Sequence, residues 1–191
     1  MMQLIGSETE KNILTAFAGE SQARNRYTYF AKQARNEGFV QISQIFERTA
    51  EQEKEHAKRL FKFLQGGEVQ ITAGFPAGTI GSTLQNLESA VAGEHYEYTE
   101  MYPDFARIAT QEGFNDISAA FTAIAVAEMQ HEKQYREFID NINADRVFRR
   151  TNSVVWYCAN CGYLHENTEP PVTCPACAHD RKYFQLLAEN W

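Results

Sequence analysis

The stretch that decides the fold reads FAKQARNEGFVQISQIFERTAEQEKEH and occupies residues 30–56. At an offset of 75, residues 105–131 read FARIATQEGFNDISAAFTAIAVAEMQH. The two stretches agree at 12 of 27 positions, whereas chance at ordinary composition would give roughly two. In both copies, apolar residues recur at helical spacing on either side of a glycine. The repeat therefore predicts two copies of one helical hairpin, related by an approximate two-fold axis.

One extra residue breaks the symmetry of this repeat. The triplet AGE occurs at residues 18–20 and again at 92–94, an offset of 74 instead of 75. The second copy therefore carries one additional residue between Glu94 and Phe105. Because an insertion inside a continuous helix is usually absorbed as a π-bulge, a wide helical turn is predicted there.

Apolar residues at helical spacing predict four helices of about 28 residues each, at about residues 7–37, 40–65, 82–112 and 114–142. Gly38 and Gly113 make short connections, which give antiparallel pairs. The loop EVQITAGFPAGTIG, residues 68–81, is long enough to cross from one pair to the other. We therefore expect an all-α, four-helix ferritin-like bundle over residues 1–146 and a small C-terminal β-rich metal domain over residues 147–191.

Composition limits the partners that this chain can have. Its 191 residues are 43% apolar, which is enough for a sizeable core, and its formal net charge is −7. An acidic chain without a basic block argues against nucleic acid or an anionic membrane surface as a partner. The first residues, MMQLIGSETEKN, lack the pattern of a signal peptide, and no apolar run is long enough to span a membrane. We expect a soluble, cytoplasmic protein.

The repeat aligns three pairs of residues that can bind metal: Glu20 with Glu94, Glu53 with Glu128, and His56 with His131. A single Glu-x-x-His on a helix is typical of an acidic surface with an incidental histidine. Two Glu-x-x-His motifs at matching positions of the repeat, each with a glutamate about 33 residues earlier on the partner helix, are instead typical of di-iron carboxylate bundles. A carboxylate-rich set with one imidazole per ion favours iron or manganese over zinc or copper.

Three further residues flank this set of ligands. Glu97 lies where the first copy has Ala23, so it adds a seventh ligand on one side only. We expect an asymmetric site, in which Glu97 and His56 compete for the same ion. Tyr27 and Tyr102 match in the repeat and have two interpretations: core packing, or hydrogen bonds to ligand carboxylates.

All four cysteines lie in the last 40 residues, as two Cys-x-x-Cys pairs separated by 12 residues: Cys158, Cys161, Cys174 and Cys177. In a chain without an export signal this pattern indicates metal rather than disulfides. A segment of this size is also too small to stay folded without a cross-link such as a bound metal ion. The spacing predicts a tetrahedral four-thiolate site and leaves zinc and iron open.

The residues around the cysteines resemble those of rubredoxin, in which one iron held by four thiolates carries single electrons. They are Gly162 after the first pair, Pro175 inside the second pair, and the aromatic residues Trp156, Tyr157 and Tyr163. With the helical repeat, the whole chain from about residue 5 to 191 resembles the rubrerythrin family, a ferritin-like di-iron domain followed by a rubredoxin-like domain.

The resemblance implies a non-haem peroxidase that reduces hydrogen peroxide to water and protects against oxidative stress. It implies two irons in the bundle and one iron at the cysteines, where zinc is possible in recombinant preparations. The ligands would divide into two bridges, Glu53 and Glu128, one set for the first iron, Glu20, Glu97 and His56, and one set for the second, Glu94 and His131. The catalytic group would comprise Glu97, His56, Tyr27 and Tyr102.

The expected partners are hydrogen peroxide, a redox protein or reductase that donates electrons, and a second copy of the chain in a homodimer or larger assembly. Two alternatives come from other functional classes. One is an iron-handling protein that oxidises ferrous iron for storage, as ferritin does. The other is a non-catalytic scaffold with a structural zinc ribbon.

Overall fold

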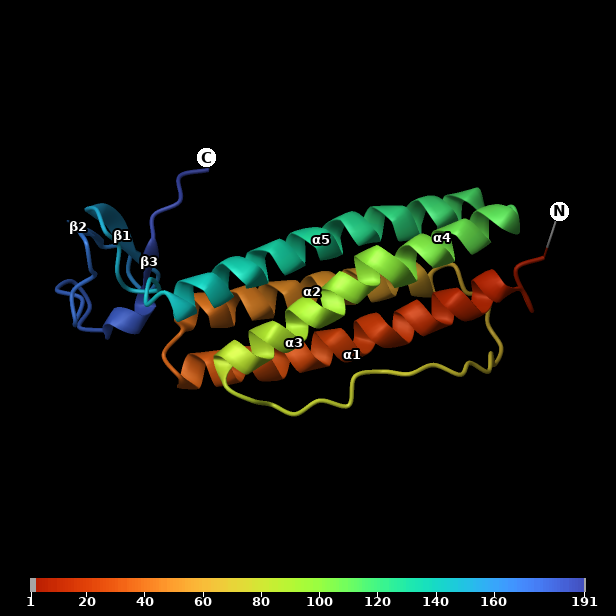
Figure 1. Ribbon diagram of the computed structural model, residues 1–191, viewed down its shortest axis with the longest axis horizontal. Coiled ribbons are helices and arrows are strands. Elements are labelled where there is room, and N and C mark those ends of the chain that lie inside the picture. The colour runs from red at the N-terminus through yellow and green to blue at the C-terminus, as the bar shows by residue number, and fades with distance from the viewer. Residues whose placement is uncertain (1–2, 191) are drawn as a thin grey trace.

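The computed structural model describes residues 3–190, which form a helical bundle with a small sheet domain at one end (Figure 1). The helical elements are α1 (Glu8–Asn36), α2 (Val40–Phe61), α3 (Thr83–Tyr96), the π-helical turn η1 (Glu97–Met101), α4 (Tyr102–Gln111) and α5 (Asn115–Asn143). The predicted four-helix ferritin-like class is confirmed, with α3, η1 and α4 together forming the third helix. Residues 1, 2 and 191, at the ends of the two predicted domains, lie outside the described residues.

The second helix ends earlier than predicted. α2 stops at Phe61 instead of residue 65. The backbone N–H of Phe63 donates to the carbonyl of Leu60 at 3.0 Å, a short-range bond that tightens the last turn. Gly66 and Gly67 then adopt φ angles of 93° and 84°, which an L side chain rarely tolerates. The loop that crosses between the hairpins therefore starts earlier, at residue 62, and ends at residue 82.

The wide turn predicted between Glu94 and Phe105 is confirmed. Five residues, Glu97–Met101, form a π-helix, and the N–H of Tyr102 donates to the carbonyl of Glu97. Pro103, just after this turn, has no backbone N–H. The irregular hydrogen bonding of the wide turn therefore leaves one fewer N–H group in need of a partner. The extra residue of the second repeat copy is absorbed here.

Two glutamates at matching positions of the repeat join the hairpins at their ends. Glu37, in the turn between α1 and α2, accepts a hydrogen bond from the backbone N–H of Thr83 at 2.9 Å. Glu112, in the turn between α4 and α5, accepts from the N–H groups of Glu8 at 3.1 Å and Thr9 at 2.8 Å. Each turn therefore caps the first helix of the other hairpin, where N–H groups lack intrahelical partners.

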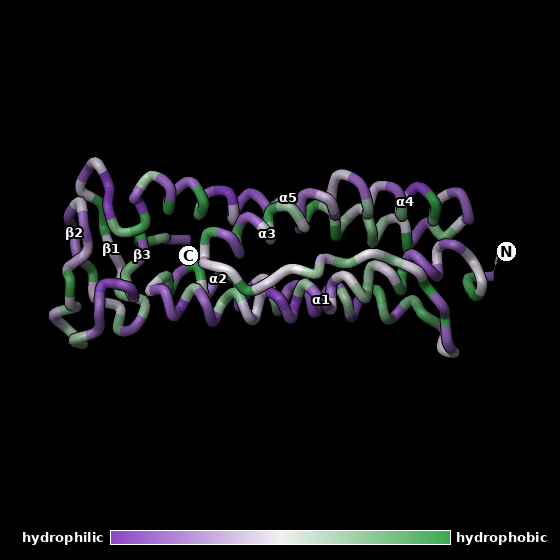
Figure 2. Tube along the Cα trace, turned by 60° about the horizontal axis from the view of Figure 1, so that its bottom comes forward, coloured by the Kyte–Doolittle hydropathy of each residue, from purple (hydrophilic) through white to green (hydrophobic). Residues whose placement is uncertain are grey.

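The bundle interior contains two apolar clusters. One includes Phe46 and Tyr135 and the other includes Leu60 and Phe121, and all four side chains are fully buried. Polar and apolar residues alternate along the helices, as expected for elements with one face in a core (Figure 2). Within residues 3–190, no helix combines the length and the apolar character that crossing a membrane requires.

The small domain is a three-stranded antiparallel sheet in the order β2–β1–β3, formed by β1 (Val154–Cys158), β2 (Leu164–Asn167) and β3 (Phe184–Leu186). The short helix η2 (Arg181–Tyr183) precedes β3. Trp156 and Phe184 form its core with two of the cysteines. Both η2 and β3 contact α2, so this domain lies at the end of the bundle where α1 turns into α2 (Figure 1).

Candidate metal centre

Four glutamates from the four helical segments meet at mid-bundle: Glu20 of α1, Glu53 of α2, Glu94 of α3 and Glu128 of α5. Their exposed fractions are 1% or less. Helical spacing of three residues puts His56 on the same face as Glu53, and His131 on the same face as Glu128. Residues that match in the sequence repeat therefore occupy equivalent positions around the centre.

The ligand atoms fall into two groups, and within each group they lie within 4.8 Å of one another. The first group contains Glu20, Glu53, His56 and Glu128, and the second contains Glu53, Glu94, Glu128 and His131. Glu53 and Glu128 belong to both groups. This sharing is the arrangement that two bridging carboxylates require.

The two histidines occupy equivalent positions in these groups. Nδ1 of His56 lies 2.9 Å from Glu128, 3.0 Å from Glu53 and 3.6 Å from Glu20. Nδ1 of His131 lies 2.8 Å from Glu128, 3.1 Å from Glu53 and 3.7 Å from Glu94. The same ring nitrogen therefore faces three carboxylates in each half of the centre.

The buried oxygens identify what the centre can hold. Glu20 Oε2, Glu94 Oε2 and both oxygens of Glu128 are buried and lack an aligned hydrogen bond within residues 3–190, as does His131 Nδ1. Buried polar atoms of this kind are costly unless something pairs with them. Carboxylate oxygens and imidazole nitrogens are suitable ligands for iron. The donor set fits two divalent cations, one per group.

Protonation in the metal-free centre follows from burial and crowding. Burial, with the charge of Glu53, raises the pKa of Glu20 to about 8 and raises that of Glu94 well above its usual value. Burial lowers the pKa of His131, but the carboxylates of Glu128 and Glu53 close to its Nδ1 outweigh burial and raise the value to about 12. Glu20 thus holds a proton at pH 7 that a cation must replace.

Both predicted tyrosines reach ligand carboxylates. The hydroxyl of Tyr27 donates to Glu94 Oε1 at 2.6 Å, and the hydroxyl of Tyr102 donates to Glu20 Oε1. Each bond occupies one oxygen of its glutamate, and the other oxygen, Oε2, is the one left without an aligned partner. The tyrosines therefore orient the two carboxylates and leave one oxygen of each free to bind a cation.

Glu97 lies at the edge of the centre rather than within either ligand group. It is half-buried, and it lines a cavity together with Tyr27. Burial and the nearby charges, of which Glu20 is the strongest, raise the pKa of Glu97 well above its usual range. The charges of the other glutamates therefore act on the Glu97 carboxyl group, which also borders the cavity.

Sequence reasoning missed one contact to a histidine. The side-chain oxygen of Gln52 lies 3.1 Å from Nε2 of His131, on the side of the ring away from the carboxylates. A partner of this kind fixes the tautomer of a metal-binding histidine. The repeat aligns Gln52 with Ala127, so the sequence carries no paired signal that could have revealed it.

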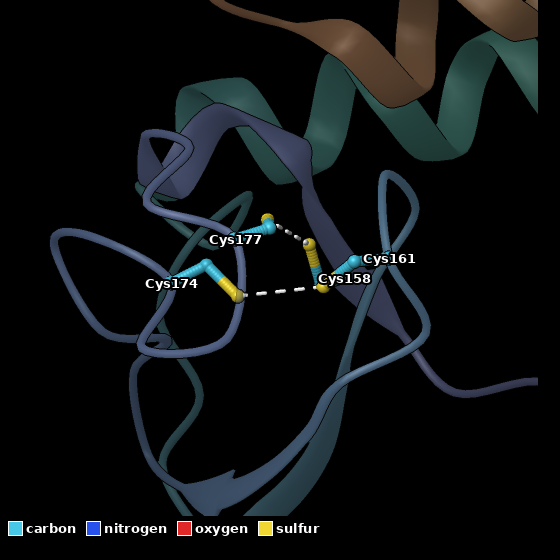
Figure 3. A group of neighbouring side chains, drawn as sticks. All are labelled: Cys158, Cys161, Cys174 and Cys177. Atoms are coloured by element: carbon cyan, nitrogen blue, oxygen red, sulfur yellow. Dashed lines mark hydrogen bonds between the residues drawn. The ribbon is translucent and has the colours of Figure 1, made fainter.

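The four cysteines form the second site (Figure 3). All four sulfurs lie within 4.8 Å of one another, with 3.9 Å between Cys158 and Cys177 and 3.6 Å between Cys161 and Cys174. A tetrahedral ion with metal–sulfur bonds of about 2.3 Å separates its sulfurs by roughly 3.8 Å. The backbone N–H of His179 lowers the pKa of Cys177 to about 6, which favours the thiolate that binds metal.

Comparison with known proteins agrees with this geometry. The rubrerythrin family model matches residues 11–139, and the model of the rubrerythrin rubredoxin-like domain matches residues 156–185. The chain is 61% identical to rubrerythrin of Nitratidesulfovibrio vulgaris over 191 residues, which is 100% of both chains. It is 53% identical to rubrerythrin of Porphyromonas gingivalis over 97% of this chain and 93% of that one.

Among solved structures, fully reduced (all-ferrous) nigerythrin is similar, with a TM-score of 0.65 and 34% identity over 95% of this chain and 87% of that chain. The matches run through both the helical bundle and the cysteine domain. On this basis the chain belongs to the rubrerythrin family.

Proposed function

We propose that this protein is a non-haem di-iron peroxidase that reduces hydrogen peroxide to water and so protects against oxidative stress. The observation that carries the proposal is that Glu53 and Glu128 belong to both ligand groups, since two ions joined by shared carboxylates can act together. When bound, two ferrous ions supply the two electrons that cleaving an O–O bond requires.

The side chains around the centre have different roles. The two irons would be held by Glu20, Glu53, Glu94 and Glu128, with His56 and His131. Tyr27 and Tyr102 orient two of the carboxylates. Glu97 faces both the cavity and the centre, and its raised pKa suits a group that passes a proton to a leaving oxygen.

The cysteine site supplies electrons in this proposal. Cys158, Cys161, Cys174 and Cys177 would hold one iron, which would supply single electrons to the centre; zinc at the same position could not do so. The electrons arrive from a redox protein or a reductase. Four free thiols suit a reducing compartment, and we infer a cytoplasmic location.

The position of the cysteine domain supports a homodimer. From His131 to the end of α5 at Asn143 is 12 residues, or roughly 18 Å of helix, and the cysteine domain lies beyond that end (Figure 1). Electron transfer weakens steeply with distance. A second chain packed head to tail would bring its cysteine domain beside this centre.

Rapid mixing of the anaerobic, all-ferrous protein with hydrogen peroxide tests the peroxidase. We expect fast oxidation by peroxide and slow oxidation by oxygen, together with a red four-thiolate iron whose colour bleaches on reduction. Faster oxidation by oxygen than by peroxide would favour iron storage instead, and a colourless zinc-filled cysteine site would favour a scaffold.

A mixture of two inactive variants tests transfer between subunits. One variant has Glu97 and Glu128 replaced, and the other has Cys158 and Cys161 replaced. We expect peroxidase activity to return when their subunits exchange. If mixed dimers form and the activity stays absent, electrons do not pass between chains.

A further inference from the structure

A cavity of about 220 Å³ lies between α1, the π-helical turn and the loop around Phe75. At its buried end are Ala23 and Tyr27, with exposed fractions of 6% and 2%. At its outer end are Phe75 and Tyr96, which are 39% and 52% exposed. The cavity thus connects the surface with Tyr27, whose hydroxyl contacts Glu94.

Two glycines inside helices keep this cavity open. Gly19 of α1 and Gly93 of α3 both line it, and neither has the positive φ angle that requires glycine. Glycine is a poor helix former, so an interior position needs another reason. A methyl group would meet nothing within 4 Å at Gly93 and only Phe75, at 3.9 Å, at Gly19. The missing side chains leave space in the cavity that Tyr27 and Glu97 also line.

The loop that covers the cavity is held in place. The side-chain amide of Gln22 donates to the carbonyl of Pro76 at 3.0 Å. The loop runs alongside α1 in both views of the molecule (Figures 1 and 2). Phe75 therefore forms a fixed outer wall opposite Gly19.

The cavity is larger and more apolar than hydrogen peroxide needs. Its volume corresponds to about seven water molecules at roughly 30 Å³ each, whereas hydrogen peroxide has only two oxygen atoms. Phe75, Met101 and Phe105 line it with apolar surface. Gln22, Arg26 and Glu97 also line the cavity, and the apolar part of the wall favours an alkyl group leaving water.

We propose that this cavity is the substrate entrance of the centre and that it accepts hydroperoxides carrying a small alkyl group. The alkyl group lies against Phe75, Met101 and Phe105, and the hydroperoxide group points toward Glu97 and Tyr27. This inference rests on the proposed peroxidase function. Cleavage of the O–O bond would take two electrons and two protons and would yield one alcohol and one water; two ferrous ions held by the centre would supply one electron each.

A binding measurement tests the cavity without turnover. In the full-length protein loaded with zinc, which is redox-silent, tert-butyl alcohol stands for the product. We expect its titration to shift the amide NMR signals of Gly19 and Gly93 in a saturable way. Gly93→Leu, which fills the cavity, should abolish the shift at Gly19. Unchanged signals in the wild-type protein would overturn the proposed binding site.

Single-turnover kinetics then test the substrate class. We expect the all-ferrous protein to be oxidised by tert-butyl hydroperoxide as well as by hydrogen peroxide. Gly93→Leu should slow the alkyl substrate at least about tenfold and hydrogen peroxide by less than about threefold, as expected when an apolar pocket selects by size. Ala92→Leu adds a larger side chain at the neighbouring exposed position of α3 and should leave both rates unchanged.

The outcomes separate this inference from the function on which it rests. Oxidation by hydrogen peroxide but not by tert-butyl hydroperoxide would refute the substrate class and leave the peroxidase intact. Oxidation by neither would refute the peroxidase. If Gly93→Leu binds less iron, Phe75→Ala replaces it, because this change lies on the loop; it should speed the bulkier cumene hydroperoxide, and an unchanged rate would refute the entrance.

Discussion

Loading the centre with two ferrous ions should release at least two protons at pH 7. Cations bind ionised carboxylates and neutral imidazoles, so every proton held by the metal-free cluster must leave. Glu20 has a pKa of about 8, and burial with neighbouring charge raises the pKa of Glu94 and Glu97 well above 4.5. Neighbouring carboxylates outweigh burial, raise the pKa of His56 and raise that of His131 to about 12. The pKa values of Glu20 and His131 lie above 7, so these two groups set the lower limit.

Anaerobic calorimetry in two buffers of different ionisation enthalpy measures this proton release. The cysteine site is filled with zinc beforehand, so that only the helical centre takes up ferrous iron. Glu97→Gln serves as the matched control, because glutamine keeps the shape and carries no ionisable proton. Because Glu97 lies outside both ligand groups, we expect this variant to release the same number of protons as the wild-type protein.

The dependence on pH has a definite sign. The pKa of Glu20 is raised to about 8, so this carboxyl group is protonated at pH 7 and ionised at pH 9. The number of released protons should therefore fall by about one between these two pH values, and the apparent affinity for iron should rise. Release of fewer than two protons at pH 7 would refute the protonated Glu20 and His131 inferred from this packing.

Other substitutions test separate parts of the structure. Glu97→Ala should keep two irons and slow peroxide oxidation by about 10²-fold or more, as for loss of a proton-transfer group, whereas Glu53→Ala should lose metal; iron analysis and rapid mixing distinguish them. Gln52→Ala should weaken metal binding about tenfold through the orientation of His131, measured by competition with a chelator. Glu112→Ala should lower the unfolding free energy by about 1–2 kcal/mol, measured with urea. Partial burial raises the pKa of Glu112, but hydrogen bonds from the start of α1 outweigh it and lower the pKa below 4.5. The stabilisation is therefore present above pH 4.5 and should vanish as the pH falls through the lowered pKa.

The features that the sequence could predict are those that recur along it. The single-residue offset between the repeat copies located the π-helical turn, because an inserted residue in a helix has few other places to go. The Glu-x-x-His pairs predicted which side chains share a face, because helical geometry fixes that spacing.

Contacts without a counterpart in the repeat could not be predicted. Gln52 reaches His131 across the bundle, and the two residues are 79 positions apart. The cavity at Gly93 depends on how the crossing loop lies over α1, which no periodic pattern encodes. The early end of α2 at Phe61 depends on a local short-range hydrogen bond, in a stretch whose apolar spacing still resembles a helix.

The reciprocal caps at Glu37 and Glu112 have a consequence for how this protein arose. Each hairpin carries a glutamate that closes the other hairpin, and each contributes three of the six ligands of the two groups. Two unlinked copies of one ancestral hairpin could therefore have assembled into a symmetric, metal-binding dimer before gene duplication and fusion joined them. In such an ancestor any new carboxylate would have appeared on both sides of the centre at once. Only after fusion was Glu97 free to arise on one side alone.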